Sequence, residues 1–215
     1  MQGYWVIEGV DGVGKTTVLR TLANQLLANK VDFILTKEPG GPKALAAEWQ
    51  ATEYPFGELY DGFRELCVNN PQIPQLAKRA LYKADSFYNW LNVVKPALAA
   101  NKLVLSDRSW VSDIAYGTAL AKVPAEALYQ FNTALVPEQA ALTNVIYLDC
   151  PEDVREARLA TNVIDHADLI GVEARRAVQA AYIHTLETYV SKYHVIDTNQ
   201  PVLKIVDSII NNCLQ

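Results

Sequence analysis

The stretch Gly-Val-Asp-Gly-Val-Gly-Lys-Thr at residues 9–16 decides the fold of this chain. It matches the pattern G-x-x-x-x-G-K-S/T at every fixed position. It lies between an apolar, β-rich run at residues 4–7 and a segment with helical spacing of apolar residues at 15–29. Glycines in such a loop let successive backbone N–H groups point inward at phosphate oxygens, and the helix N-terminus adds a partial positive charge. The stretch therefore predicts a loop that binds a nucleoside triphosphate.

The polar residues of this loop have separate expected roles. The Lys15 ammonium should reach the terminal phosphates, and the Thr16 hydroxyl should bind Mg²⁺. The other residues that we expect at the triphosphate are Gly9, Asp11, Gly12, Val13, Gly14 and Thr17.

Short apolar runs in the rest of the chain alternate with segments of helical periodicity. The runs predict strands at residues 33–36, 103–105, 144–148 and 194–196. The periodic segments predict helices at residues 75–101 (closing near Pro96), 124–135, 152–160 and 173–192. Residues 39–74 are rich in glycine and proline pairs, and we expect mixed helix and loop there. This alternation indicates an α/β fold, a parallel sheet with helices on both faces.

Composition narrows the class of protein. A length of 215 residues suits one domain, and a formal net charge of -5 argues against a protein that binds nucleic acid polymers. The three scattered cysteines show no metal-ligand spacing, so we expect free thiols in a reducing compartment. We see no signal peptide and no apolar run that approaches the roughly 20 residues of a membrane span. These features predict a cytoplasmic protein that does not associate with membranes.

Four further segments follow the predicted strands in order. Residues 36–41 read Thr-Lys-Glu-Pro-Gly-Gly, close to T-R-E-P-G-G, and residues 107–116 fit D-R-x-x-x-S-x-x-A-Y. Residues 148–158 contain Leu-Asp-Cys-Pro-Glu and two arginines, and residues 196–201 read Ile-Asp-Thr-Asn-Gln-Pro. Together with the phosphate-binding loop, these segments resemble the thymidylate kinase family across residues 4 to 201.

The resemblance implies a fold and a reaction. The fold is a three-layer sandwich with a five-stranded parallel sheet, a single P-loop kinase domain over residues 1–215 with a short lid at about 155–172. The reaction is phosphoryl transfer from ATP, with Mg²⁺, to a deoxynucleoside 5'-monophosphate. The resemblance also implies a homodimer. Ligands should lie beyond the carboxyl ends of the strands, where the motifs fall.

The resemblance also assigns roles near the transferred phosphate. Arg108 should hold the acceptor phosphate, for which a guanidinium fork is better suited than a point charge. Lys37 stands where the family usually has Arg and would supply charge without the fork. Asp11 should contact the acceptor sugar 3'-hydroxyl or the magnesium shell, and Asp107 should assist Mg²⁺ or orient Arg108. Glu8 precedes the loop and should support it.

The remaining expected site residues surround the two nucleosides. Arg155 or Arg158 should approach ATP from the lid, by stacking on adenine or by contacting phosphate. Tyr116 should lie against the sugar 2' position and disfavour a ribose. The other residues that we expect at the monophosphate are Glu38, Pro39, Tyr82, Ser86, Ser112 and Asp113.

The sequence departs from the family pattern at five further positions. Gly12 stands where one branch of the family has Arg, and His166 stands where the lid pattern of the other branch has Arg. Tyr82 replaces a Phe that stacks on thymine, and Ser86 replaces an Arg that donates to thymine O4. Asp113 stands where a neutral polar residue is common, and its carboxylate could accept from thymine N3–H or from guanine.

These departures leave the acceptor open. The intact overall pattern favours dTMP, and the altered pocket allows dGMP, a modified pyrimidine or several deoxynucleotides. Two further hypotheses are a kinase that acts on a deoxynucleoside and a nucleotide-binding module without catalysis.

Overall fold

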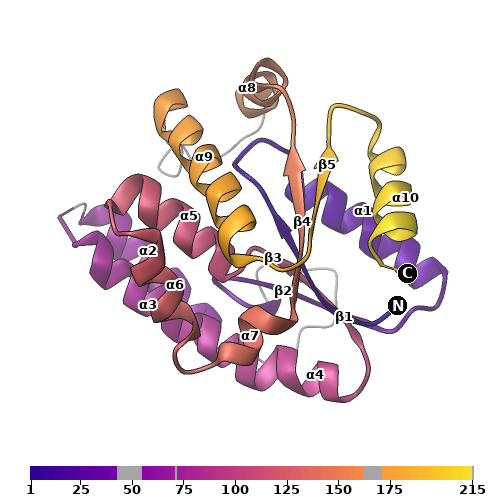
Figure 1. Cartoon of the computed structure of the whole chain (residues 1–215), viewed down its shortest axis with the longest axis horizontal. Helices are drawn as coiled ribbons and strands as arrows, with labels where there is room; N and C mark the ends of the chain where they lie inside the picture. Colours follow the sequence, from indigo (N-terminus) through magenta and orange to yellow (C-terminus); the bar gives the residue numbers. More distant parts are fainter. Residues whose placement is uncertain (43–54, 71, 162–170, 215) are drawn as a thin grey trace.

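The computed structural model describes residues 1–42, 55–70, 72–161 and 171–214 (Figure 1). Five parallel strands form one sheet in the order β2-β3-β1-β4-β5. Their bounds are β1 Gly3–Glu8, β2 Phe33–Lys37, β3 Leu103–Asp107, β4 Thr143–Asp149 and β5 Tyr193–Asp197. All five predicted strands are present, each one or two residues longer than its apolar run, and the predicted five-stranded parallel sheet is confirmed.

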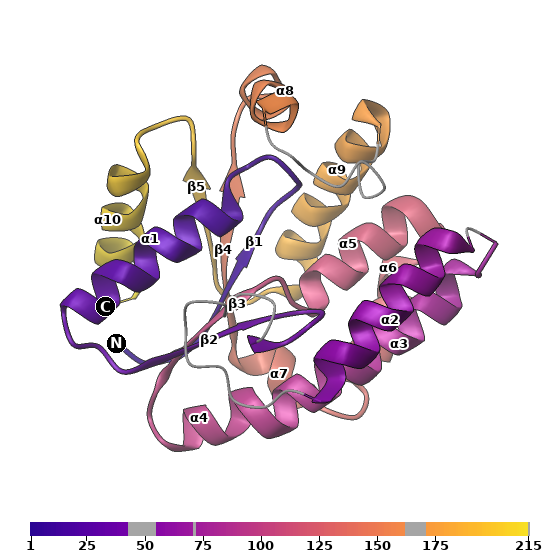
Figure 2. The same ribbon diagram turned by 180° about the vertical axis from the view of Figure 1, so that it is seen from behind.

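Helices cover both sides of the sheet, so the fold is a three-layer sandwich. Helices α1 (Lys15–Ala28) and α10 (Val202–Asn212) lie on one side, and α5 (Trp110–Ala121) and α9 (Val172–Tyr189) on the other (Figures 1 and 2). Because side chains of a strand alternate between its two faces, β1 contributes to two apolar clusters. Trp5 and Ile7 pack in the larger cluster, while Tyr4 and Val6 pack in a smaller one.

The helix predicted at residues 75–101 is divided into three parts. Helix α3 (Gln75–Asn89) passes into a π-helical turn, η2 (Trp90–Val94), and then into α4 (Lys95–Ala99). Pro96 lies in the first turn of α4 and does not end the helix as predicted. A proline removes one backbone donor, and a wider π turn before it accommodates that loss. The helical course ends at Ala99, two residues before the predicted end.

The other predicted helices occur with small shifts: α6 (Ala125–Thr133), α8 (Glu152–Thr161) and α9. The helices that the sequence did not predict are α5, α7 (Pro137–Leu142) and α10. Helix α5 is buried on most sides, so it lacks the alternation of polar and apolar residues that identifies a helix in sequence. Its start is fixed by Ser109, whose hydroxyl accepts from the N–H of Val111 at 3.2 Å.

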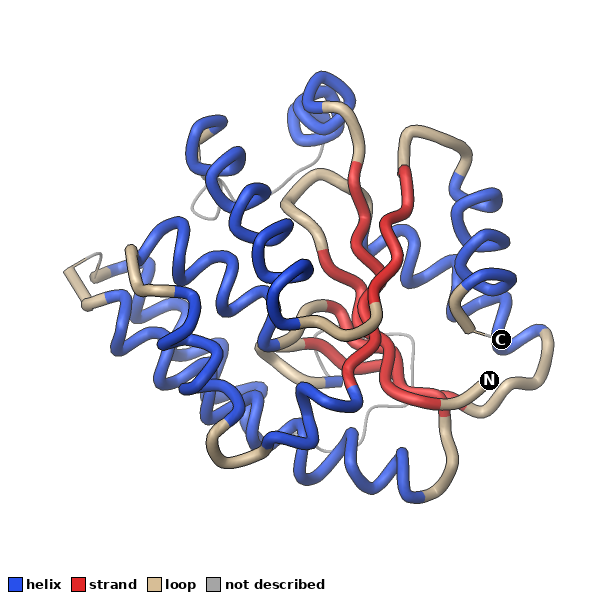
Figure 3. The backbone as a smooth tube through the Cα atoms, viewed as in Figure 1, coloured by secondary structure: helices blue, strands red, loops and turns tan. Residues whose placement is uncertain are grey.

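The stretch expected as mixed helix and loop contains α2 (Pro55–Asn69) (Figure 3). The cysteines at positions 67, 150 and 213 are free thiols, as predicted. A search of the described residues finds no helix with the length and apolar character needed to cross a membrane.

Candidate active site

A cavity of about 970 Å³ opens at the carboxyl ends of the strands. The phosphate-binding loop and the start of α1 form one wall, and the residues after β2 and β3 form the floor. Helices α2, α3 and α5 form the far wall. Among the residues expected at the site, those that line the cavity are Asp11, Gly12, Val13, Gly14, Lys15, Thr16, Thr17, Lys37, Glu38, Pro39, Tyr82, Ser86, Asp107, Arg108, Ser112, Asp113, Tyr116 and Arg158.

The phosphate-binding loop curls around the Lys15 side chain. The Lys15 ammonium donates to the carbonyl oxygens of Gly9 at 2.8 Å and Val10 at 3.1 Å, and it lies 3.7 Å from the Asp11 carboxylate. Burial, aided by the charge of Arg108, lowers the pKa of Lys15 to about 8. The loop conformation requires glycine at position 12, where φ is +88° and an added Cβ would lie 2.7 Å from Arg155 Cγ.

Arg108 lies at the centre of the cavity, directly after β3. Its guanidinium donates to Asp11 Oδ1 at 2.5 Å, and to the hydroxyls of Tyr182 at 3.0 Å, Ser112 at 3.3 Å and Tyr116 at 3.3 Å. Burial opposes the ionisation of Asp11, but the charges of Arg108 and Lys15 outweigh it and hold the pKa of Asp11 below its usual value. The cavity thus holds a partly buried guanidinium, oriented by four hydrogen bonds, beside the phosphate-binding loop.

The position of Arg108 relative to the loop is fixed by the sheet. Ile7 pairs with Asp107 in the register of β1 and β3, and the Arg108 N–H donates to the Ile7 carbonyl oxygen at 3.0 Å. Arg108 adopts a left-handed backbone conformation with φ of 71°. Non-glycine residues seldom adopt this conformation, and it is found at sites where the surrounding structure enforces it.

A second layer of polar groups holds this arrangement from beneath. The fully buried Glu8 carboxylate accepts from the hydroxyls of Ser109 at 2.9 Å, Ser112 at 2.5 Å and Tyr182 at 3.0 Å. Burial raises the pKa of Glu8. The Tyr182 hydroxyl therefore joins Glu8 to Arg108. In the sequence, Tyr182 looks like one more core position of α9, and no motif marks it.

Asp107 and Thr16 fit the requirements of a Mg²⁺ site. Asp107 is buried, and within the described part of the chain its Oδ1 atom has no hydrogen-bond partner. A buried carboxylate oxygen without a donor is costly, and an oxygen ligand is what Mg²⁺ prefers. Thr16 lies at the exposed start of α1, beside the same cavity.

The far wall of the cavity carries aromatic and acidic side chains. The Tyr82 ring packs against Tyr60 and Phe63 of α2, with centroids 6.2 and 6.1 Å away. The Ser86 hydroxyl donates to Glu38 Oε2 at 2.9 Å, and Asn89 donates to Glu38 Oε1 at 3.1 Å. Burial raises the pKa of Glu38 to about 7. Ser86 is therefore engaged by Glu38 at the base of this wall.

Asp113 is paired with a residue that sequence reasoning missed. Arg79 of α3 donates to Asp113 Oδ1 at 2.7 Å, and Asn132 of α6 donates to Asp113 Oδ2 at 2.9 Å. The three side chains line the cavity, and Arg79 is buried. Arg79 and Asp113 are 34 positions apart. No short motif connects them, so the ion pair is visible only in the fold.

The two arginines of α8 have different surroundings. Arg158 donates to the carbonyl oxygens of Val13 at 3.2 Å and Thr198 at 2.7 Å, and so joins the phosphate-binding loop to the end of β5. Arg155 is fully buried against Gly12, donates to Gln179 at 3.4 Å and does not line the cavity. His166 and the middle of the expected lid, residues 162–170, lie outside the described residues.

Known proteins are similar in sequence to this chain over nearly its full length. A family model described as Thymidylate kinase matches residues 7–209. The thymidylate kinase of Pediococcus pentosaceus is 28% identical over 225 aligned residues, which cover 98% of this chain and 100% of the relative. The thymidylate kinase of Limosilactobacillus reuteri is 29% identical over 218 residues, which cover 97% and 94%. The region that the family model matches contains the end of β1, the other four strands, the phosphate-binding loop and Arg108, and the chain belongs to the thymidylate kinase family.

Proposed function

We propose that this protein transfers the γ-phosphate of ATP to dTMP and releases dTDP and ADP. The observation that carries this proposal is the Arg108 guanidinium, held beside the phosphate-binding loop by Asp11 in a cavity large enough for two nucleotides. Phosphoryl transfer depends on positioning and charge neutralisation more than on a covalent nucleophile. A cavity with one cradle for a triphosphate and a separate guanidinium for a second phosphate meets that need.

Different residues bind the two nucleotides and the metal ion in this proposal. The loop amides and Lys15 bind the triphosphate, while Arg108 and Lys37 hold the acceptor phosphate in line with it. Thr16 and Asp107 are suited to hold Mg²⁺, which supplies charge neutralisation on the phosphate oxygens. Arg158 stands where it would meet the adenosine of ATP. An acceptor oxygen attacks the γ-phosphorus, the bond to the β-phosphate oxygen breaks, and ADP leaves.

The acceptor nucleoside lies against the far wall in this proposal. The Tyr82 ring stacks on the base, and Tyr116 lies against the sugar at its 2' position. Asp11 is within reach of the sugar 3'-hydroxyl, because it already contacts both Arg108 and Tyr116. The names of the family and of both relatives favour dTMP as the acceptor.

We also propose that the chain acts in the cytoplasm as a homodimer, with one kinase domain and a lid at about 155–172. Support for the dimer comes from exposed apolar side chains on neighbouring helices: Leu59, Leu66, Leu76 and Leu81 of α2 and α3. Analytical ultracentrifugation tests this directly, and a monomer at micromolar concentration would refute it.

The experiment that tests the reaction is a coupled ADP-release assay against a panel of nucleosides and monophosphates. Turnover with dTMP is expected, and Lys15→Ala should abolish it while leaving the fold intact by circular dichroism. A response to dGMP that exceeds the response to dTMP would favour guanine as the acceptor base. ADP release that does not rise with any acceptor, while ATP still binds, would favour a nucleotide-binding module without catalysis.

A further inference from the structure

A buried lysine lies in the far wall of the cavity, and it belongs to none of the sequence motifs. Lys83 follows Tyr82 in α3, and it precedes Ser86 by three residues, so Lys83 and Ser86 share one face of the helix. The Lys83 side chain is 3% exposed and lines the cavity. Lysine is rarely buried without a counter-charge or full hydrogen bonding, because desolvation of an ammonium group is costly.

Few groups in the described part of the chain use the three donors of this ammonium. Lys83 Nζ donates to Gln139 Oε1 at 3.5 Å, the outer limit for a hydrogen bond, and lies 4.2 Å from the centre of the Phe87 ring. Glu38 is near enough to act on Lys83 through its charge, yet no ion pair within 4.0 Å joins them in the described residues. Within the described residues Lys83 thus makes one hydrogen bond, at the outer distance limit, while its side chain lines the cavity.

A carboxylate lines the same cavity from the neighbouring helix α5. Asp113 lines the cavity from α5, and its charge also acts on Lys83. Arg79 and Asn132 each donate to one oxygen of Asp113, which keeps the group oriented and leaves each oxygen a second lone pair. An ammonium can only donate, and an ionised carboxylate can only accept. Neither group can exchange roles as an amide or a hydroxyl can.

We propose that Lys83 and Asp113 select the acceptor base by its oxo group and adjacent ring N–H. The proposal rests on the proposed kinase function. Lys83 donates to the exocyclic oxygen, O4 of thymine or uracil or O6 of guanine, and Asp113 accepts from the neighbouring N–H. Cytosine and adenine present an amino group and a bare ring nitrogen, which places a donor opposite Lys83 and an acceptor opposite Asp113. Buried charges left unpaired by such a base disfavour its binding.

The test compares kcat/KM for dTMP, dUMP, dGMP, dCMP and dAMP in the wild type and in Lys83→Met. Methionine keeps the unbranched, flexible shape of the side chain up to the Cε position and removes the charge. Loss of a charged hydrogen bond should lower kcat/KM for dTMP roughly 10- to 150-fold, with little loss for dCMP, so the ratio of dTMP to dCMP falls at least about tenfold. Lys83→Arg, which retains a donor, should keep more of this ratio than Lys83→Met.

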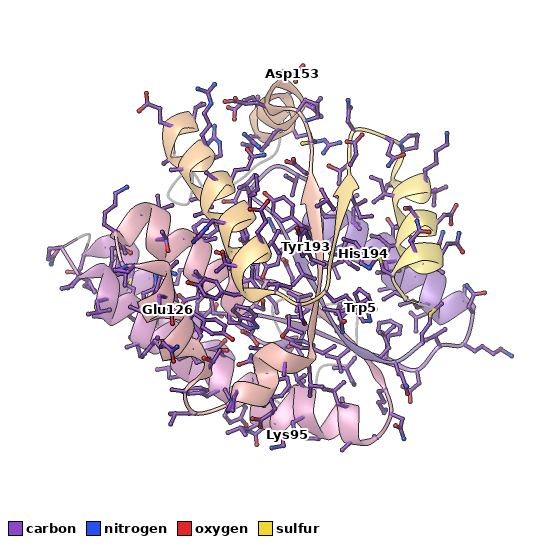
Figure 4. All side chains as sticks on the ribbon, viewed as in Figure 1. Trp5, Lys95, Glu126, Asp153, Tyr193 and His194 are labelled. Atoms are coloured by element: carbon purple, nitrogen blue, oxygen red, sulfur yellow. The ribbon has the colours of Figure 1, made fainter. Side chains whose placement is uncertain are left out.

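The matched control is Lys95→Met. Lys95 lies at the start of α4, its side chain is 58% exposed, and it pairs with Glu138 at the edge of the molecule far from α8 (Figure 4). This variant should leave the ratio unchanged. If Lys83→Met does not fold, Asp113→Asn is measured instead. The new amide can donate to the bare ring nitrogen of cytosine, so the ratio of kcat/KM for dTMP to that for dCMP should fall.

Two results would overturn the inference and leave the kinase function standing. One is a wild type that phosphorylates dCMP or dAMP as efficiently as dTMP. The other is a folded Lys83→Met with a ratio of dTMP to dCMP within about twofold of the wild type. A wild type that phosphorylates no monophosphate would instead refute the proposed function itself.

Discussion

Substitution of Gly12 by alanine tests how tightly the phosphate-binding loop is packed against α8. An added Cβ would lie 2.7 Å from Arg155 Cγ, 2.9 Å from Leu159 Cγ and 3.1 Å from the Arg155 carbonyl oxygen. Real Cβ atoms are essentially never found at the two shorter distances, and the groups involved are not free chain ends. Either the loop or α8 must move.

The magnitude follows from two terms. A residue with a Cβ at φ of +88° costs about 1–2 kcal/mol, and overpacking of a tight contact costs about 1–3 kcal/mol. The expected loss in free energy of unfolding is therefore about 2–5 kcal/mol, a large share of the roughly 5–15 kcal/mol typical of a folded domain. Displacement of the loop amides should also weaken ATP binding by at least about tenfold.

Gly62 provides the matched control. It lies inside α2, exposed to solvent, and an added Cβ would meet no atom within 4 Å. Gly62→Ala should therefore stabilise the protein by about 0.5–1 kcal/mol through helix propensity. Urea unfolding measures both stabilities, and isothermal titration calorimetry measures ATP affinity. A Gly12→Ala protein with wild-type urea midpoint and wild-type ATP affinity would refute the packing argument.

Arg108, Tyr182 and Lys15 each give a separate prediction. Arg108→Lys keeps one charge but loses the fork, so kcat/KM for the acceptor should fall roughly 10- to 150-fold; a change below about threefold in steady-state kinetics would contradict this role. Tyr182→Phe removes the hydroxyl that joins Glu8 to Arg108 and should lower both the urea midpoint and kcat, whereas Tyr189→Phe, which removes only an exposed hydrogen bond to Glu126, should change neither. Because burial lowers the pKa of Lys15 to about 8, kcat/KM for ATP should decline above pH 8. The free energy of unfolding has the opposite pH dependence: the contribution from Lys15 is fully present above pH 10.5 and is lost as pH falls through 8. Lys15→Met should remove this increase in stability between pH 8 and 10.5 in urea titrations at several pH values.

The sheet and the phosphate-binding loop could be predicted because their signals are local. Each strand is a short apolar run, and the loop is a contiguous motif with a strand before it and a helix after it. Helix α5 escaped prediction because burial on most of its sides removes the polar face. The π-helical turn at residues 90–94 has no sequence signal apart from Pro96, which suggested an end to the helix instead.

The residues around the motifs were less accessible to sequence reasoning. Asp11 and Arg108 belong to recognisable motifs 97 positions apart, so both were expected at one site. Arg79, Lys83 and Tyr182 lie in helices where each reads as an ordinary amphipathic or core position. Their importance depends on which distant side chains face them, such as Asp113 opposite Arg79. Tertiary packing decides those pairs, and a single sequence does not encode them in any short pattern.

The hydrogen bond from the Arg108 N–H to the Ile7 carbonyl has a geometric consequence for catalysis. The loop proposed to hold the donor nucleotide follows β1, and Arg108, proposed to hold the acceptor, follows β3, which pairs directly with β1. The two strand ends are separated by the spacing of adjacent strands, about 4.8 Å, which hardly varies among proteins. The sheet therefore fixes how far the phosphate-binding loop lies from Arg108. Adjustments that accommodate different bases must come from the helices of the far wall.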